Sequence, residues 1–178
     1  MGRACPVPLT QAVLKYHADV RRIAVTGHLN LSPQSVPLVR RAIADLLAAF
    51  SGDGLTGITC LARGADSVFA EAVLDRGGTL EVILPSADYR ARKVEADHAP
   101  QFDALIRRAA RVHILPLDRA GRDAYAAANQ AMLDSCDELF AVWDGRPGDM
   151  ASTASVVAQA RQRGIPVHVI WPEGAVRR

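Results

Sequence analysis

The chain has 178 residues, of which 49% are apolar and 5% aromatic, and its formal net charge is +2. This length is sufficient for one domain with a hydrophobic core, and the composition is typical of an α/β protein. So small a net charge gives no reason to invoke an anionic membrane, and nucleic acid is not expected as a partner.

Residues 1–20 form the least regular part of the sequence. Pro6 and Pro8 favour an irregular start, although Thr10 is suited to cap a short helix after them. We therefore expect residues 1–20 to be an accessory segment that packs on a single domain formed by residues 21–178. No apolar run in the chain approaches membrane-spanning length.

Short apolar runs recur along residues 21–178 and predict buried strands. They lie at residues 21–26, 57–61, 79–84, 111–115, 139–143 and 167–171. Between them, apolar residues at helical spacing predict helices, the first of which has Ser32 as its cap and Pro33 at its first position. These helices are expected near residues 33–50, 67–76, 100–109, 124–136 and 152–162.

Strands and helices alternate with short connections throughout this domain. Such alternation predicts an α/β fold, a Rossmann-like, doubly wound, mostly parallel sheet with helices on both faces. In this architecture the loops after the carboxyl ends of the strands meet at one rim, where ligands bind. The rim loops expected here span residues 27–28, 62–66, 85–89, 116–123 and 144–153.

The segment 138–156 contains the most suggestive of these loops. An apolar strand ends before Asp144 and Gly145, a turn-rich loop follows, and a helix restarts at Ser152 and Thr153. Backbone N–H groups and hydroxyls at such a helix start suit an anion. Asp144 suits ribose hydroxyls or a metal and is the only catalytic candidate that we name. A turn-forming Asp-Gly pair and simple helix capping explain the same residues without a ligand.

The loops after the first two strands add further candidates. Gly27 lets a phosphate or a ribose approach the backbone, and His28 is either a donor to an anion or a loop residue without a ligand role. Arg63 is either a phosphate partner or a solvated side chain. Gly64 suits a close backbone approach, and Asp66 at a helix start is interpreted first as a helix cap.

Four more candidates fall near the same rim. Pro85 closes the third strand, and Tyr89 and Tyr125 are suited either to stack on a base or to fill the core. Asn129 lies in mid-helix, where Asn is unfavourable, which indicates a ligand contact or a hydrogen bond to a neighbouring loop. The convergence of these residues, more than any one of them, favours a ligand site.

Several common catalytic and metal-binding patterns are absent. The sequence has no Walker A, HExxH, Ser-His-Asp or GxGxxG pattern, and its histidines are isolated. The three cysteines, Cys5, Cys60 and Cys136, fit neither a zinc knuckle nor a CxxC motif and favour a reducing cytoplasm. We therefore expect no metal, no cofactor and a cytoplasmic location.

Several segments between residues 23 and 171 resemble the SLOG superfamily of Rossmann-like proteins. After a first strand ending in Gly27 and His28, they are LARGAD, AEAVLDRGG with LEVILP, AYAAAN with AMLDSCDELFAVWDG, and STASVVAQARQRGIPVHVIW. This superfamily contains the Lonely Guy (LOG) nucleotide phosphoribohydrolases and the DprA/Smf proteins. The resemblance implies a nucleotide-binding domain over residues 21–178 and, since many members are dimers, a homodimer.

The same resemblance assigns uncharged residues to the catalytic positions of the LOG enzymes. Those enzymes cleave the N-glycosidic bond of a nucleoside monophosphate with a PGGxGTxxE loop and an Arg-Lys pair on the preceding helix. When Asp137 and Thr153 are aligned with the matching motif residues, Ala128 and Asn129 replace the Arg-Lys pair and Val156 replaces the glutamate. Catalysis by the usual LOG residues is therefore not expected.

Two main hypotheses follow from the sequence. The first is a binding or sensor protein for a nucleotide or nucleotide-derived ligand, such as an ADP-ribose-like molecule or a nucleoside monophosphate. The alternative is a LOG-like phosphoribohydrolase, an N-glycosidic hydrolase with a rearranged active site, in which Asp144 supplies the carboxylate that such a reaction needs. A DprA-like nucleic-acid module is a third hypothesis, against which the low net charge counts.

Overall fold

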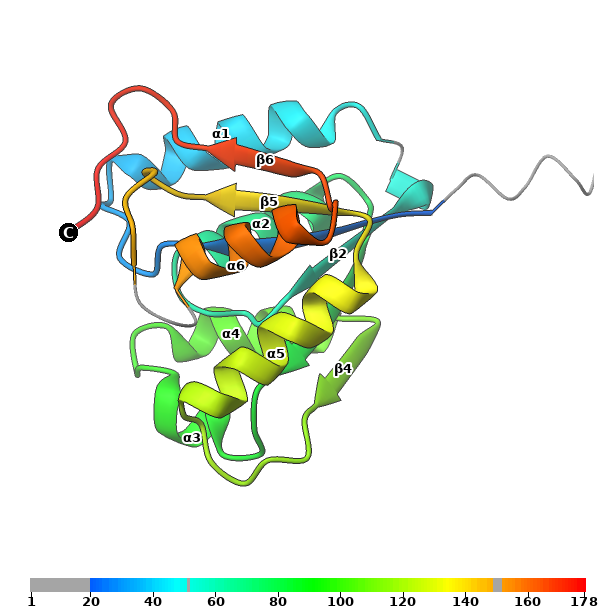
Figure 1. The fold of residues 1–178 in the computed structure, drawn as a ribbon, viewed down its shortest axis with the longest axis vertical. Coiled ribbons are helices and arrows are strands. Elements are labelled where there is room, and N and C mark those ends of the chain that lie inside the picture. The colour runs from blue at the N-terminus through cyan, green and yellow to red at the C-terminus, as the bar shows by residue number, and fades with distance from the viewer. Residues whose placement is uncertain (1–19, 51, 149–151) are drawn as a thin grey trace, which may run out of the picture.

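A six-stranded sheet in which every strand pair is parallel forms the centre of the computed structural model (Figure 1). The structure describes residues 20–50, 52–148 and 152–178, so nearly all of the expected accessory segment lies outside the described residues. The order across the sheet is β4-β3-β2-β1-β5-β6. The strands are β1 (Arg21–Gly27), β2 (Leu55–Thr59), β3 (Thr79–Leu84), β4 (Arg111–Ile114), β5 (Glu138–Val142) and β6 (Val167–Ile170).

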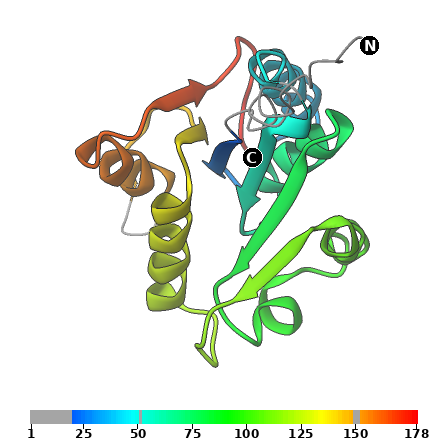
Figure 2. The ribbon, with the colours of Figure 1, turned by 90° about the vertical axis from the view of Figure 1, so that its right-hand side faces the viewer.

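Helices cover both faces of the sheet (Figure 2). They are α1 (Ser35–Leu47), α2 (Ala65–Asp75), α3 (Tyr89–Lys93), α4 (Ala99–Arg108), α5 (Arg122–Ser135) and α6 (Thr153–Gln162). On one face, α1 and α2 bury Ile43 and Phe69 in a cluster with Phe140 of the sheet. On the other face, α5 and α6 bury Met132 and Ala160. The predicted Rossmann-like α/β fold with helices on both faces is confirmed.

The order of the strands creates a switch point between β1 and β5. From β1 the chain adds β2, β3 and β4 in one direction, and it then returns through α5 to place β5 on the other side of β1. The next helices after these two strands, α1 and α6, consequently pack on opposite faces of the sheet. In open parallel sheets a ligand crevice forms at such a point, beyond the carboxyl ends of the strands.

The first helix begins later than the sequence predicts. Its first residue is Ser35, and Pro33 and Gln34 form a turn before it. The Ser32 hydroxyl still accepts the Ser35 N–H at 3.2 Å, which is the contact expected of a cap at Ser32. The edge strand β4 is also unusual, since Val112 and Ile114 are 38% and 50% exposed. The homodimer expected from the resemblance stays a prediction. No helix in the described ranges is both long and apolar enough to cross a membrane.

Candidate functional site

A cavity of about 980 Å³ lies beyond the carboxyl ends of the strands, at the crevice between β1 and β5. Its wall is built by the loops after β1, β2 and β5, by the starts of α2, α3 and α6, and by one side of α5. Most of the expected ligand-binding residues line it: Gly27, His28, Arg63, Gly64, Asp66, Tyr89, Tyr125, Asn129, Ser152 and Thr153. Pro85, Asp144 and Gly145 lie outside this wall.

Two glycines of the rim are required by the packing of α2. Gly64 has a φ of +82°, which L side chains rarely adopt, and a Cβ there would lie 2.6 Å from the carbonyl oxygen of His28. A Cβ on Gly27 would collide with Ala65 and would lie 2.8 Å from the Cβ of Val142. Close approach of protein to protein therefore explains both glycines, whereas the sequence suggested approach of a ligand to Gly27.

Asp66 is 6% exposed in the first turn of α2. Its Oδ2 accepts hydrogen bonds from the Thr59 hydroxyl at 3.0 Å and from the N–H groups of Cys60 and Ala62 at 3.2 and 3.4 Å. None of these donors belongs to α2, so Asp66 is not the helix cap that the sequence suggested. It fixes the loop after β2, where Leu61 adopts a left-handed φ of 53°. Burial raises the pKa of Asp66 from 3.8 to about 6, although the three hydrogen bonds oppose the shift.

Aromatic and sulfur-containing side chains lie near Asp66 at the floor of the cavity. Tyr89 at the start of α3 is 6% exposed, and its ring meets that of Tyr125 edge-on with 6.4 Å between centroids. The Cys60 Sγ lies 3.6 Å from the Met132 Sδ. Burial, and then the negative charge of Asp66, raise the pKa values of Tyr89 and Cys60. The hydroxyl and the thiol therefore stay protonated at neutral pH.

The start of α6 forms another part of the wall. Ser152 has extended backbone geometry, and its hydroxyl caps the helix by accepting the Ser155 N–H at 3.4 Å. Thr153 and Ala154 follow it along the cavity. Because the N–H groups of a first helical turn have no acceptor within the helix, this end of α6 presents donors and a partial positive charge.

Basic side chains outnumber acidic ones around the cavity. In the described ranges its wall contains Arg63, Lys93, Arg146, Arg177 and Arg178, against Asp66 and Glu95. Arg63 is already paired with Glu95 and Asp97, each at 2.6 Å, which leaves its charge neutralised by protein carboxylates. Arg146, Arg177 and Arg178 come from the loop after β5 and from the C-terminal segment. Asp144 lies 3.7 Å from Arg146 and 3.1 Å from Arg177, so these three guanidinium groups against one carboxylate leave this part of the wall with a local positive charge.

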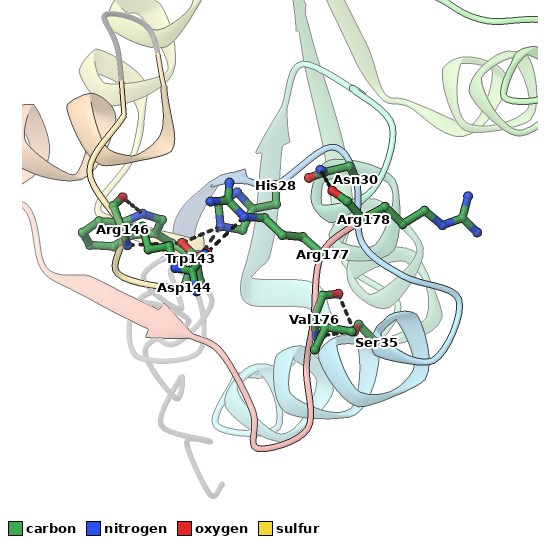
Figure 3. Close-up of polar contacts among 9 residues, drawn as sticks. All are labelled: His28, Asn30, Ser35, Trp143, Asp144, Arg146, Val176, Arg177 and Arg178. Atoms are coloured by element: carbon green, nitrogen blue, oxygen red, sulfur yellow. Dashed lines mark hydrogen bonds and ion pairs between the residues drawn. The ribbon is translucent and has the colours of Figure 1, made fainter.

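Asp144 and His28 form a polar network beside the cavity (Figure 3). The Asp144 carboxylate lies 3.0 Å from the His28 Nε2 and 3.1 Å from the Arg177 Nε, and it accepts the Arg146 N–H at 3.2 Å. Burial acts to raise the pKa of Asp144, but the Arg146 N–H, His28 and Arg177 outweigh it and hold the pKa below its ordinary value. Asp144 lines a separate cavity of about 270 Å³. Its contacts make it an anchor for the C-terminal segment, and the ribose, metal or catalytic role suggested by the sequence stays a prediction.

The C-terminal segment reaches the site by pairing with the chain after β1 (Figure 3). The Val176 N–H donates to the Ser35 Oγ at 2.7 Å, and the Arg178 N–H donates to the Asn30 carbonyl at 2.8 Å. These bonds bring Arg177 and Arg178 into the wall. Sequence reasoning missed both arginines, because the pairing joins residues such as Ser35 and Val176 that are 141 positions apart.

Two of the positions aligned with charged residues of the LOG enzymes are apolar and buried in this protein. Ala128 and Val156 are each 1% exposed and belong to the core cluster under α5 and α6. Ala128 and Asn129 border the cavity, whereas Val156 does not. Over the described ranges, no group of three or more His, Cys, Asp or Glu side chains is placed to hold a metal ion.

No protein-family model and no curated protein sequence matches the chain. Several solved structures match the chain in fold. DprA from Streptococcus pneumoniae matches with a TM-score of 0.61 at 18% identity, over 86% of this chain and 51% of that one, so this chain spans about half of its length. DprA from Helicobacter pylori gives 0.62 at 15% identity, over 89% and 69%. The molybdenum cofactor binding protein from Rippkaea orientalis gives 0.55 at 19% identity, over 84% and 75%.

These comparisons contradict one expectation from the sequence. The Helicobacter pylori structure is described as revealing a single-stranded DNA binding mode of DprA, so a protein of this fold does hold nucleic acid. The expectation that nucleic acid is not a partner was wrong because it relied on the net charge of +2. Binding of a polyanion depends on the charge of one surface, and the basic wall of the cavity is a local feature that the sum over the chain conceals.

The sheet and the comparisons agree on the type of fold. Both DprA structures and the molybdenum cofactor binding protein match more than four fifths of this chain. This domain shares its Rossmann-like fold with these proteins, which is the fold that the resemblance to the SLOG superfamily implied.

Proposed function

We propose that this domain binds a nucleotide-type ligand in the cavity between β1 and β5, with the phosphate at the start of α6 and the base toward Asp66. The distribution of charge along the wall is the observation that carries the proposal. Arg146 lies in the loop before α6, and Arg177 and Arg178 lie in the C-terminal segment. Asp66 lies with aromatic side chains at the starts of α2 and α3, where the wall also contains Lys93 and an Arg63 that is paired with Glu95 and Asp97. A nucleotide has the same polarity, with an anionic end and a heteroaromatic end that carries hydrogen-bonding groups.

The start of α6 suits the phosphate for two reasons. Its first-turn N–H groups, next to Thr153, are donors aimed out of the helix end, and the helix dipole favours an anion there. Arg146 follows β5 in the same wall and is 75% exposed, so its guanidinium is able to move onto a phosphate and bind it with two hydrogen bonds.

The length of the cavity suits one nucleotide unit. The loop that holds Asp66 follows β2, and α6 follows β5, which is two positions away in the sheet. Two strand spacings amount to roughly 10 Å. An extended mononucleotide covers a comparable distance, so its base would reach Tyr125 and Asp66 while its phosphate stays at Thr153.

The test is thermal unfolding with AMP, ADP, NAD and ADP-ribose, followed by calorimetric titration of any compound that raises the midpoint. Thr153→Glu sets a carboxylate against the phosphate and should abolish the shift. Ala158→Glu makes the same charge change on an exposed side of α6 and should preserve it. Equal affinity in the two variants would remove α6 as the phosphate site, and no shift with any compound would reject the proposal.

Single-stranded nucleic acid is a second candidate, favoured by the likeness to DprA and by the same basic wall. A fluorescent oligothymidylate should then bind with an affinity that falls steeply as salt rises, because counterions are released from its phosphates. Competition by AMP decides between the candidates. An oligonucleotide that binds much more tightly than AMP, and is not displaced by it, favours the second.

The LOG-like hydrolase remains the alternative of a different class. It requires a carboxylate beside the glycosidic bond, and the Asp144 carboxylate is engaged by His28 and Arg177 outside the main cavity. We expect binding without turnover. Chromatography after prolonged incubation with nucleoside monophosphates measures this directly, and release of base that is lost in Asp144→Asn would instead support the hydrolase.

A further inference from the structure

Asp66 has one carboxylate oxygen that the protein uses and one that it does not. All three hydrogen bonds to this side chain, from Thr59, Cys60 and Ala62, end on Oδ2. Within the described ranges, no fully enclosed side-chain oxygen or nitrogen lacks a hydrogen-bond partner. Because Asp66 is 6% exposed and borders the cavity, Oδ1 has its remaining accessible surface there.

We infer that Oδ1 of Asp66 is the acceptor that recognises a hydrogen-bond donor of the ligand, so that a nucleotide binds to the ionised form of Asp66 and is released when this group takes up a proton. The inference rests on the proposed function and adds to it the chemistry of one contact. The donor is either an N–H of the base or a ribose hydroxyl, since a nucleotide carries both kinds of donor.

The arrangement around Oδ2 determines where a proton goes. With three donors directed at Oδ2, a proton taken up by Asp66 resides on Oδ1 and turns that atom from an acceptor into a donor. A ligand N–H or O–H then faces another hydrogen, and its hydrogen bond is lost. Since the pKa of Asp66 is about 6, this exchange falls between pH 5 and pH 7.

Other ionisable groups face the same space and have to be separated from Asp66. Cys60 lies on its own loop and Tyr89 on α3, and the charge of Asp66 raises the pKa of both. The cavity wall adds His28 after β1, Lys93 and Glu95 around the end of α3, His98 before α4, Tyr125 on α5, and the arginines 63, 146, 177 and 178. Among the carboxylates of this wall, only Asp66 is buried with a raised pKa.

The experiment measures the affinity of the full chain for AMP from pH 5 to pH 8 by calorimetry. If only the ionised form binds, the fraction available at pH 5 is roughly one tenth, and the apparent affinity should rise about tenfold up to pH 7.5 and then level off. Asp66→Asn should bind weakly at every pH, because its carbonyl oxygen replaces Oδ2 and its NH2 group faces the ligand donor. It should also lose the part of the rise that comes from Asp66, whereas ionisation of the AMP phosphate, with a second pKa of about 6, contributes equally in both proteins.

Two further variants keep the result decisive. Thr59→Val removes a hydrogen bond that lowers the pKa of Asp66, so the midpoint of the affinity curve should move to higher pH. His98→Gln is the control for one of the two imidazoles in the wall, those of His28 and His98, and should leave the rise in place. With 2′-deoxyadenosine monophosphate and inosine monophosphate, loss of affinity at pH 7.5 identifies the ribose hydroxyl or the base amine as the donor.

The failures of the two proposals are distinguishable. Affinity for AMP that is the same in Asp66→Asn as in the wild type, or a rise with pH that has the same size in both proteins, overturns the role of Oδ1 and leaves nucleotide binding intact. Affinity that falls from pH 5 to pH 7.5 shows a ligand acceptor facing protonated Asp66, which also overturns the inference. If the wild type binds no nucleotide at any pH, the proposed function is overturned and the inference with it.

Discussion

Replacing Asp66 by Asn is expected to stabilise the folded protein at neutral pH, although it should damage the proposed ligand site. Asp66 is 6% exposed, and burial raises its pKa from 3.8 to about 6. A shift of about 2 pH units means that the ionised carboxylate costs the native state roughly 3 kcal/mol. Asn has no charge to bury, and its carbonyl oxygen is able to accept the hydrogen bonds from Thr59, Cys60 and Ala62.

The pH dependence fixes the sign of the effect. Well below pH 4 the carboxyl is protonated in both the folded and the unfolded chain, so ionisation of Asp66 makes no difference to stability. Between pH 4 and pH 6 the unfolded chain loses the proton first, and the wild type becomes progressively less stable than the variant. Above pH 6 the carboxylate is ionised in both states, and the difference between the two proteins stays constant.

Urea unfolding followed by tryptophan fluorescence at pH 4, 5, 6 and 8 provides the assay. The free energy of unfolding of Asp66→Asn, relative to the wild type, should increase by roughly 2–3 kcal/mol between pH 4 and pH 8. Asp53→Asn, at an exposed carboxylate, is the matched control for the loss of one charge. A difference between Asp66→Asn and the wild type that is the same at all four pH values would refute the reasoning from the buried charge.

Three further results are expected in the same unfolding assay. Gly64→Ala should lower stability by about 2 kcal/mol or more, because it combines a left-handed φ with a collision, whereas Gly121→Ala, which has space for a Cβ, should have little effect. Asp144→Asn should lower the free energy of unfolding by about 1–2 kcal/mol at pH 7. Because the pKa of Asp144 is held low in the folded protein, this loss should shrink as the medium becomes acidic. A loss that is independent of pH would argue against the pairing of Asp144 with Arg177. Ser152→Ala should cost about 1 kcal/mol through loss of the α6 cap, and an unchanged free energy would show that the cap contributes nothing.

The sequence alone determined the elements of this fold and the edge of the sheet that carries the site. Apolar runs such as 139–143 and 167–171, separated by helical repeats and turn residues, required alternating strands and helices. That alternation implied a parallel sheet whose loops meet at one rim. The candidates Gly27, Tyr125 and Thr153 line one cavity because each follows a strand or opens a helix at that rim.

Only the tertiary structure decided which charges are available there. The sequence suggests Arg63 and Asp144 as ligand partners. In the structure, Glu95 and Asp97 neutralise the charge of Arg63, whereas His28 and Arg177 contact the carboxylate of Asp144. Conversely, Arg177 and Arg178 reach the wall through backbone pairing with the chain after β1, which no local pattern encodes.

Asp66 illustrates why the sequence determines the elements of the fold but not the contacts of the charged side chains. Its position at a helix start fits a cap first and a place at the ligand rim second, and residue order alone does not show which groups it contacts. Burial, three donors on one oxygen and contact with the cavity arise only when the loop after β2 folds over it. Periodicity acts over a few residues and fixes secondary structure, whereas burial and ion pairing depend on segments that meet only in the folded chain.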